Sequence, residues 1–346
     1  MKIQKDVIVG GDKQIKAGDL KQVGGAEVKG QKTAKVGSKH PTPELPPNAD
    51  VGPNAIEAYI GAKLAGQMSR IPQFKGKSLE KAAFKLILDP TGVDKRNAFS
   101  IYFEAESKDT FLDNGDIKRM AAALQESMTK GVEVLLPEGK AGVFAGWTVK
   151  IDKVDKPTGA MYHDLYMDDA KGTLKKAGAL VRVRVIEGGI GRLVTKLPGA
   201  LIQGSSVMGR FESNHSLKDK SVEQLVKEAT PDNDNNPFTL LKREFPDLDL
   251  KSLHPDVEIV DRREQFVLSN PEGEGKFLLT LDHVTSINQH NKKEGTFTEF
   301  EIERMDGSVM PKDVGELIKL SRLVGEQFNL VASPGTKHQR GAMVTE

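Results

Sequence analysis

The stretch Ser100–Lys108, with the sequence SIYFEAESK, decides the fold because its polar and apolar residues alternate. Successive side chains of a β-strand point to opposite faces, so Glu104, Glu106 and Lys108 share one face. The residues between them are mostly apolar and share the other face. The stretch therefore predicts a β-strand with one apolar face and one charged face.

Two later stretches show the same division into an apolar and a charged face. The sequence VRVRV places Arg182 and Arg184 opposite its three valines. The sequence TFTEFEIER places Glu299, Glu301 and Glu303 opposite a phenylalanine and an isoleucine. Aligned like charges on one strand repel each other unless an opposite charge lies between them. The acidic strands and the arginine strand are therefore complementary.

These charged faces have two interpretations. A solvated strand face explains any one of the three strands alone. If the sheet closes, however, the charged faces line a wet tunnel and the apolar faces pack against helices. Carboxylates would then hold hard divalent ions, and arginine and lysine would hold polyphosphate oxygens. Polyphosphate with a divalent metal is one of few ligands that needs both charge signs so densely. Inside such a tunnel, we expect Arg182 and Arg184 to repel each other in the ligand-free protein.

The rest of the chain predicts an α+β fold. Strand-like alternation occurs in AFSIYFEAESKDTF, GWTVKIDKV, ALVRVRVIE, RLVTKL, EIVDRREQFVLS, KFLLTLDHVTSI and TFTEFEIERM. Helices are predicted over Ile117–Lys130, around Val222–Lys227 and over Pro311–Leu330. Many strands with hairpin-like connections, and no regular alternation of strand and helix, favour an antiparallel sheet or barrel flanked by helices.

Composition divides the chain into three segments. Residues 1–52 contain no aromatic residue and end in a proline-rich stretch, which predicts a disordered tail and linker. Residues 53–95 have helical spacing and are predicted to be a helical lead-in. Residues 96–340 would form the barrel. The polar, irregular segment at about 200–258 is predicted to be an insertion between strands.

Overall composition excludes several classes of protein. The 346 residues include 50 Lys and Arg against 49 Asp and Glu, which argues against a basic coat for duplex nucleic acid. The absence of cysteine excludes disulfides, thiolate metal sites and cysteine nucleophiles. No apolar run approaches the roughly 18 residues of a transmembrane helix, and the first residues lack a signal-peptide core. A cytoplasmic location is therefore expected.

Several motifs together resemble a known family. Glu104-Ala105-Glu106-Ser107-Lys108 matches the ExExK signature of the CYTH, or triphosphate tunnel metalloenzyme, superfamily. The later matches are, in order, Tyr166–Asp169 with Leu174, Gly178 and Leu180–Arg184 ("YxDT…L…G..LRxR"), Thr195-Lys196 ("TxK"), Asp261–Arg263 (a basic strand), Thr280–Asp282 with Thr298–Glu301 (a late aspartate and "EIE"), and Pro334–Lys337 (a final "sK"). Asp169 replaces the threonine of YxDT, and Asp261 lies where a basic residue is expected. The chain thus resembles this superfamily from about residue 98 to 340.

The resemblance implies an eight-stranded antiparallel β-barrel whose tunnel binds a triphosphate group with Mg²⁺ or Mn²⁺. Carried over residue by residue, it implies the metal ligands Glu104, Glu106, Asp282, Glu299 and Glu301. It likewise implies the phosphate-binding residues Lys108, Arg182, Arg184, Lys196, Arg263 and Lys337. Catalysis would depend on Glu104, Glu106 and Lys108. Whether Glu303 or Arg262 joins the site is left open.

The implied activity is metal-dependent hydrolysis of a small triphosphate. The candidates are inorganic tripolyphosphate, thiamine triphosphate and nucleoside triphosphates, which present the same three phosphates. Because the superfamily also contains class IV adenylyl cyclases, cyclisation of ATP is an alternative. A non-catalytic polyphosphate- or nucleotide-binding protein is a second alternative. The expected partner is a small triphosphate, without duplex nucleic acid or a membrane.

Overall fold

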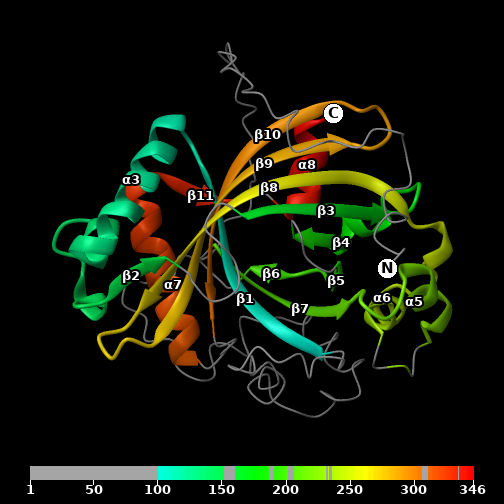
Figure 1. Cartoon of the computed structure of the whole chain (residues 1–346), viewed down its shortest axis with the longest axis horizontal. Coiled ribbons are helices and arrows are strands. Elements are labelled where there is room, and N and C mark those ends of the chain that lie inside the picture. Colours follow the sequence, from blue (N-terminus) through cyan, green and yellow to red (C-terminus); the bar gives the residue numbers. More distant parts are fainter. Residues whose placement is uncertain are drawn as a thin grey trace, which may run out of the picture. The chain divides into compact units, whose positions relative to one another are not determined.

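The computed structural model describes residues 100–346, except for gaps at 152–159, 187–190, 202–205, 231–232, 234–235, 306–310 and 334. The predicted tail at 1–52 and the predicted helical lead-in at 53–95 lie outside the described residues. Figure 1 shows the strands of the described part between two groups of helices, with α3 and α7 at one end and α5 and α6 at the other.

Eight antiparallel strands close into a barrel. The order is β1 (Ser100–Phe111), β10 (Glu294–Arg304), β9 (Gly275–Asn288), β8 (His254–Ser269), β3 (Ala160–Asp168), β4 (Leu180–Ile186), β5 (Arg192–Lys196) and β7 (Val207–Ser216). The barrel is closed because β7 also pairs with β1, for example Glu104 with Arg210. Three short strands extend the sheet: β2 (Thr148–Ile151) pairs with β8, β6 (Ala200–Leu201) with β7, and β11 (Leu330–Ala332) with β1.

Four helices of the described part, α3, α5, α6 and α8, begin at a capping side chain. The bounds of the helices are α3 (Asn114–Lys130), α4 (Thr173–Ala177), α5 (Val222–Glu228), α6 (Pro237–Glu244), α7 (Pro311–Phe328) and α8 (Lys337–Val344), with 3₁₀ turns at Val132–Leu135, Gly142–Phe144 and Leu250–Ser252. Asp113 caps α3 by accepting from the backbone N–H of Gly115. Thr336 and Gln339 form a reciprocal capping box at the start of α8. Among these helices, none has the length and apolarity needed to cross a bilayer.

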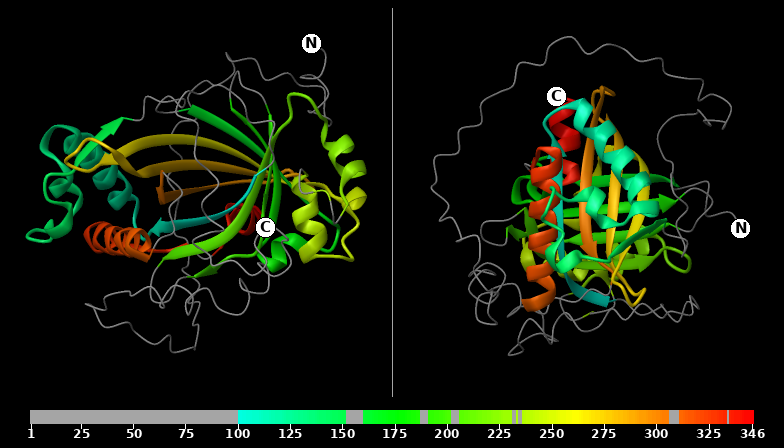
Figure 2. Two further views of the ribbon diagram at one scale, coloured as in Figure 1. Left: turned by 90° about the horizontal axis from the view of Figure 1, so that it is seen from below. Right: turned by 90° about the vertical axis from the view of Figure 1, so that its left-hand side faces the viewer.

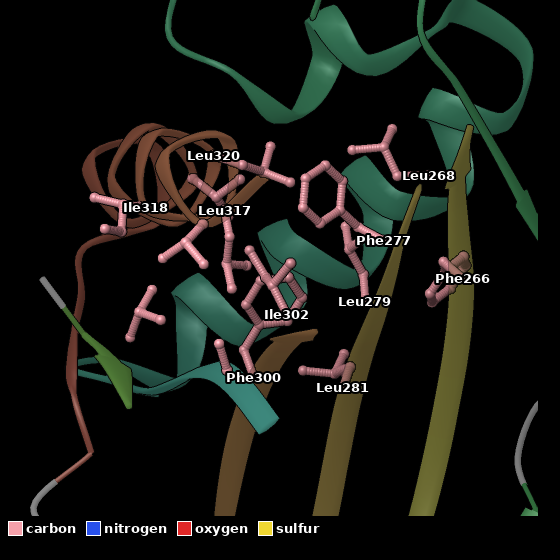
Figure 3. Packing of buried hydrophobic residues seen from close by; sticks show 14 of the residues in the cluster. Phe266, Leu268, Phe277, Leu279, Leu281, Phe300, Ile302, Leu317, Ile318 and Leu320 are labelled. Carbon is pink, nitrogen blue, oxygen red and sulfur yellow. The ribbon is translucent and has the colours of Figure 1, made fainter. Parts of the chain in front are cut away.

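The main hydrophobic core lies outside the barrel. Phe266 and Phe277, from the outer faces of β8 and β9, belong to the same cluster as Leu317 and Leu320 of α7, and Figure 3 shows Phe277 beside Leu320. The same cluster includes Met120 and Leu124 of α3. The alternation in the sequence explains this arrangement for β1, β4 and β10, because their apolar residues face this cluster and their charged residues face the interior.

A smaller apolar cluster lies inside the barrel at one end. Ala342 of α8 packs there against Tyr166, Leu180, Val257 and Ile259, whose side chains point inward. Helix α8 contacts β8, β9 and β10, and Figure 1 shows it beside these strands. At Gly341 an added Cβ would lie 2.7 Å from Ser286 Oγ and 3.1 Å from Val257 Cγ1, so the close approach of the helix to the barrel wall requires glycine.

The predicted α+β barrel is confirmed, with differences in detail. Strands β3 and β7 were not expected from alternation, whereas the predicted strand around β2 lies outside the eight-stranded barrel. The segment 200–258 therefore is not an insertion throughout, because it includes barrel strand β7 and the start of β8. Within the described part of this segment, α5 and α6 come between β7 and β8 in the chain and lie outside the barrel. Figure 2 shows the same division between strands and helices from two further directions.

Candidate functional site

The lumen of the barrel, meaning the space enclosed by the inner strand faces, collects the charged residues. Cross-strand register determines which charges meet. Lys108 of β1 lies opposite Glu301 of β10, and Glu104 of β1 lies opposite Arg210 of β7. On the far wall Arg184 of β4 lies opposite Asp164 of β3.

Lys108 connects two groups of carboxylates. Its Nζ atom donates a hydrogen bond to Glu301 Oε1 at 2.5 Å and lies 3.5 Å from Glu106 Oε1 and 4.0 Å from Glu299 Oε1. Burial disfavours the charged amine, but the carboxylates of Glu106, Glu301 and Glu299 hold the pKa of Lys108 above its ordinary value. Lys108 is therefore a permanent cation between the two groups.

The first group consists of Glu104, Glu106 and Glu303, each of which offers an oxygen within 4.8 Å of the others. Arg210 donates to Glu104 Oε2 at 3.2 Å and also to Glu106. Lys196 donates to Glu104 Oε2 at 2.8 Å. The group thus lies between two cations from β5 and β7.

The second group consists of Asp282, Glu299 and Glu301, all buried and also within 4.8 Å of one another. Arg263 forms two hydrogen bonds to Asp282, at 2.7 and 2.6 Å, and a third to Glu301 at 2.9 Å. Lys337 donates to Asp282 and lies 3.5 Å from Glu301 Oε1. Burial raises the pKa of Glu299, whereas Lys108, Lys337 and Arg263 hold the pKa of Glu301 well below its ordinary value against the effect of burial.

Asp261 adds a further carboxylate beside the second group. It is fully buried, and Lys337 donates to its Oδ2 atom at 3.0 Å. Its Oδ1 atom has no hydrogen-bond partner within the described structure, and neither does Glu299 Oε1. Burial raises the pKa of Asp261. At this position, where the resemblance implied a basic residue, the lumen is acidic.

The two arginines of β4 share one counter-ion. Arg182 donates to Asp164 Oδ2 at 3.0 Å and to the hydroxyl of Tyr166 at 2.9 Å. Arg184 donates one hydrogen bond to each carboxylate oxygen of Asp164, both at 2.7 Å, and its guanidinium group lies over the ring of Tyr162. Arg182 still repels Arg184, as expected, but Asp164 accepts from both arginines and offsets part of this repulsion in the ligand-free protein.

Helix α8 places two cationic side chains in the lumen. Besides Lys337, it carries Arg340, which donates to Glu299 Oε2 at 2.7 Å and lies 4.2 Å over the ring of Phe297. His338, which follows Lys337 in the first turn, is fully buried and bonded through Nε2 to Asp256 at 2.6 Å.

Asp256 fixes the position of α8. It also accepts from Lys175 at 3.0 Å and lies 3.1 Å from His290 Nε2. The hydrogen bond from His338, helped by the one from Lys175, lowers the pKa of Asp256 against the effect of burial. Asp168 completes a third group of possible ligands with Asp256 and His338, but it already accepts from three backbone N–H groups. This third group anchors the helix.

The two lumen groups fit a hard divalent ion. Their donors are all carboxylate oxygens, which Mg²⁺ and Mn²⁺ prefer. The buried oxygen of Glu299 that lacks a hydrogen-bond partner gives an observation independent of the count of acids. A metal ion bound to the second carboxylate group would replace the ion pairs that Lys108, Arg263 and Lys337 make with it. These three cationic side chains would then be available to bind an anion.

The structure brings every predicted site residue to the lumen. The predicted ligands, however, form two groups separated by Lys108, and Glu303 joins the first of them. Arg262, by contrast, is exposed and lies 3.5 Å from Glu264. The sequence did not reveal several lumen residues, among them Asp164, Arg210, Glu212, Tyr162 and Arg340. The pattern Arg210-Phe-Glu212 resembles the charged alternation elsewhere and was the signal available for two of them.

No protein-family model and no curated protein sequence matches the chain. Among solved structures, a candidate adenylate cyclase from Bacillus halodurans has a TM-score of 0.40 and 17% identity, covering 69% of this chain and 97% of that one. A candidate adenylyl cyclase from Hippeastrum, described as having a dominant triphosphatase activity, has a TM-score of 0.40 and 16% identity, covering 69% and 96%. The Mimivirus capping-enzyme triphosphatase has a TM-score of 0.31 and 11% identity, covering 64% and 89%.

The fold assignment depends on strand order, closure and the placement of charge. The barrel has eight antiparallel strands, and ExExK, the arginine strand and the late acidic hairpin all face its lumen. The structure thus confirms the eight-stranded antiparallel barrel with a charged lumen that the sequence resemblance implied.

Proposed function

We propose that the protein hydrolyses the terminal phosphoanhydride of a small triphosphate with the help of Mg²⁺ or Mn²⁺. One observation carries the proposal: two carboxylate groups and the cations Lys108, Arg182, Arg184, Lys196, Arg210, Arg263, Lys337 and Arg340 share one enclosed surface. A stable barrel gains nothing from so many buried charges, because burying paired ions is roughly neutral at best.

The cationic side chains of the lumen would bind the phosphates of the substrate. Arg182 and Arg184 present planar guanidinium groups suited to phosphate oxygens, and Lys196 adds a point charge on the neighbouring strand. Lys108, Arg263 and Lys337 lie around the second acidic group and would offset charge that develops on the transferring and leaving phosphates. Helix α8 covers one end of the lumen and limits access of bulk water.

The carboxylates would hold the ion. Glu104 and Glu106, with Glu303, and Asp282, Glu299 and Glu301 are the residues available for it. When bound, such an ion polarises phosphoryl oxygens and lowers the pKa of water. The role of the protein is to fix these carboxylates on three strands, β1, β9 and β10, so that the charge distribution exists before the substrate arrives.

A non-catalytic binding protein is the second candidate, and Asp261 favours it. Asp261 is a buried carboxylate at a position where a phosphate-binding cation is expected, so it would weaken the binding of the substrate phosphates. Adenylyl cyclase activity is the remaining alternative from the sequence, and no described lumen residue favours an adenine group.

Phosphate release from tripolyphosphate, thiamine triphosphate and ATP, with Mg²⁺ and with Mn²⁺, tests the proposal. A parallel assay for cyclic AMP separates hydrolysis from cyclisation. We expect metal-dependent phosphate release from at least one substrate. Ligand-induced stabilisation without turnover would establish the binding protein, and cyclic AMP without phosphate release would establish the cyclase.

A further inference from the structure

Two uncharged polar residues in the lumen, Gln265 and Thr280, have side chains without hydrogen-bond partners in the described structure. Gln265 is fully buried, and neither its amide nitrogen nor its amide oxygen has a partner within the described structure. Thr280 has 1% of its surface exposed, and its hydroxyl also has none. Buried polar groups are otherwise almost always hydrogen-bonded, so two unpaired neighbours call for a ligand that they bind.

Register places this pair beside the charged centre. Gln265 of β8 lies opposite Thr280 of β9, and Thr280 lies opposite Glu301 of β10. Glu301 in turn lies opposite Lys108 of β1. The four residues therefore form one cross-strand row on the inner face, with neighbours at the spacing of paired strands.

The same pair lies next to the residues that would hold phosphate. Gln265 follows Arg263 on the same face of β8, and Thr280 precedes Asp282 on the same face of β9. Arg263 and Asp282 are joined by two hydrogen bonds. A small ligand bound to Gln265 and Thr280 would thus lie at the edge of the second carboxylate group.

We infer that Gln265 and Thr280 hold the water molecule that attacks the terminal phosphorus, an inference that depends on the proposed triphosphatase function. The Gln265 amide offers an acceptor and two donors, and the Thr280 hydroxyl offers both roles, so together they can orient a water without carrying charge. A water needs two to four polar partners when buried, and this row supplies them.

The chemical step is a simple displacement. The water oxygen donates a lone pair to the terminal phosphorus, and a new P–O bond forms. The bond to the bridging oxygen breaks, and its electron pair leaves with the diphosphate portion. One water proton stays on the released phosphate as its hydroxyl and the other is taken up by a phosphate oxygen, so the products are inorganic phosphate and the shortened chain.

Gln265→Met and Thr280→Val test this role, because both keep approximate size and remove hydrogen bonding. We expect kcat to fall at least about tenfold in each variant, with KM and the tripolyphosphate-induced rise in Tm unchanged. The Tm without ligand should stay level or rise, since each change removes a buried polar group that lacks a partner. Gln289→Met serves as the control, because Gln289 bonds to Glu258 on the outer side.

Each other outcome overturns the inference. Unchanged kcat in both variants, with phosphate release by the wild type, rejects the water-holding role and leaves the triphosphatase function intact. A raised KM with unchanged kcat shows that the pair contacts the substrate directly. A wild type that releases no phosphate from any triphosphate overturns the proposed function, and this inference with it.

Discussion

Asp164 accepts two parallel hydrogen bonds from Arg184, with Nε to Oδ1 and Nη2 to Oδ2 both at 2.7 Å. Arg182 adds a third at 3.0 Å. Asp164 is fully buried, and the two guanidinium groups hold its pKa below the ordinary value against the effect of burial. It is therefore a fixed internal counter-ion that orients both arginines before a polyanion binds.

Asp164→Asn should destabilise the ligand-free protein. The change leaves two buried guanidinium groups side by side without a counter-ion, and breaking a buried pair in this way costs about 3–5 kcal/mol. The Tm without ligand should fall, and tripolyphosphate should raise it by more than in the wild type, because the polyanion then replaces the missing charge.

Glu258→Gln is the matched control for this change. Glu258 is a half-buried carboxylate on the adjacent strand, paired with His163 at 4.0 Å and with Gln289. It should alter neither the Tm nor the ligand-induced shift by much. An equal ligand-induced shift in Asp164→Asn and the wild type would show that the arginines do not meet the polyanion.

Arg182→Ala should lose much of the tripolyphosphate-induced rise in Tm. The remaining Arg184 keeps its two bonds to Asp164, so the variant should still fold. Arg182→Lys should restore only part of the effect, because lysine keeps the charge but loses the two-pronged geometry. Differential scanning fluorimetry with and without tripolyphosphate measures this. If the shift is absent in the wild type, the lumen does not bind polyphosphate.

The sequence predicts those features of the structure that depend on neighbouring residues. It does not predict those that depend on contacts between residues far apart in the chain. Alternation is a local property, so the inner and outer faces of β1, β4 and β10 follow directly from the residues. The pairing of Arg184 with Asp164 is different, because it depends on β3 lying beside β4, and β3 itself lacks clean alternation. Strand β7 was missed because its alternation is short: Phe211 lies between the inner residues Arg210 and Glu212, but Gly209 and Ser213 interrupt the apolar face on either side.

The position of α8 could not be derived from local pattern either. Its residues Lys337 and Arg340 reach carboxylates on three strands distant in sequence. Only packing against the barrel interior, through Gly341 and Ala342, determines that approach. The split of the acidic residues into two groups likewise depends on Lys108, whose neighbours are set by the pairing of β1 with β10.

Glu104→Gln should reduce turnover by about 10² or more, if the ion supplies several kcal/mol of charge stabilisation. Glu104 offers an oxygen to the first carboxylate group and also accepts from Lys196 and Arg210. The glutamine keeps one oxygen for these bonds, so folding should change little. Steady-state phosphate release and thermal melting measure the two effects. Full activity that is still lost on adding a chelator would place the metal elsewhere in the protein.

The buried carboxyl group of Asp109, on the outer face of β1, predicts that the stability of the protein depends on pH. Asp109 has only 4% of its surface exposed and lies near Ser206 Oγ at 3.3 Å. Burial raises the pKa of Asp109 to about 7. In the unfolded chain an aspartate has a pKa of about 3.9, so the folded state binds more protons between these values.

Stability should therefore fall as the pH rises from about 4 to about 7, and level off above it. The full loss from this group is on the order of 4 kcal/mol, since each unit of pKa difference corresponds to about 1.4 kcal/mol. Asp109→Asn removes the ionisation and should raise the free energy of unfolding at about pH 8 while changing it little at about pH 4. Urea unfolding of both proteins across this range measures the difference. A constant difference between wild type and variant at all these pH values would mean that Asp109 does not titrate in the folded protein.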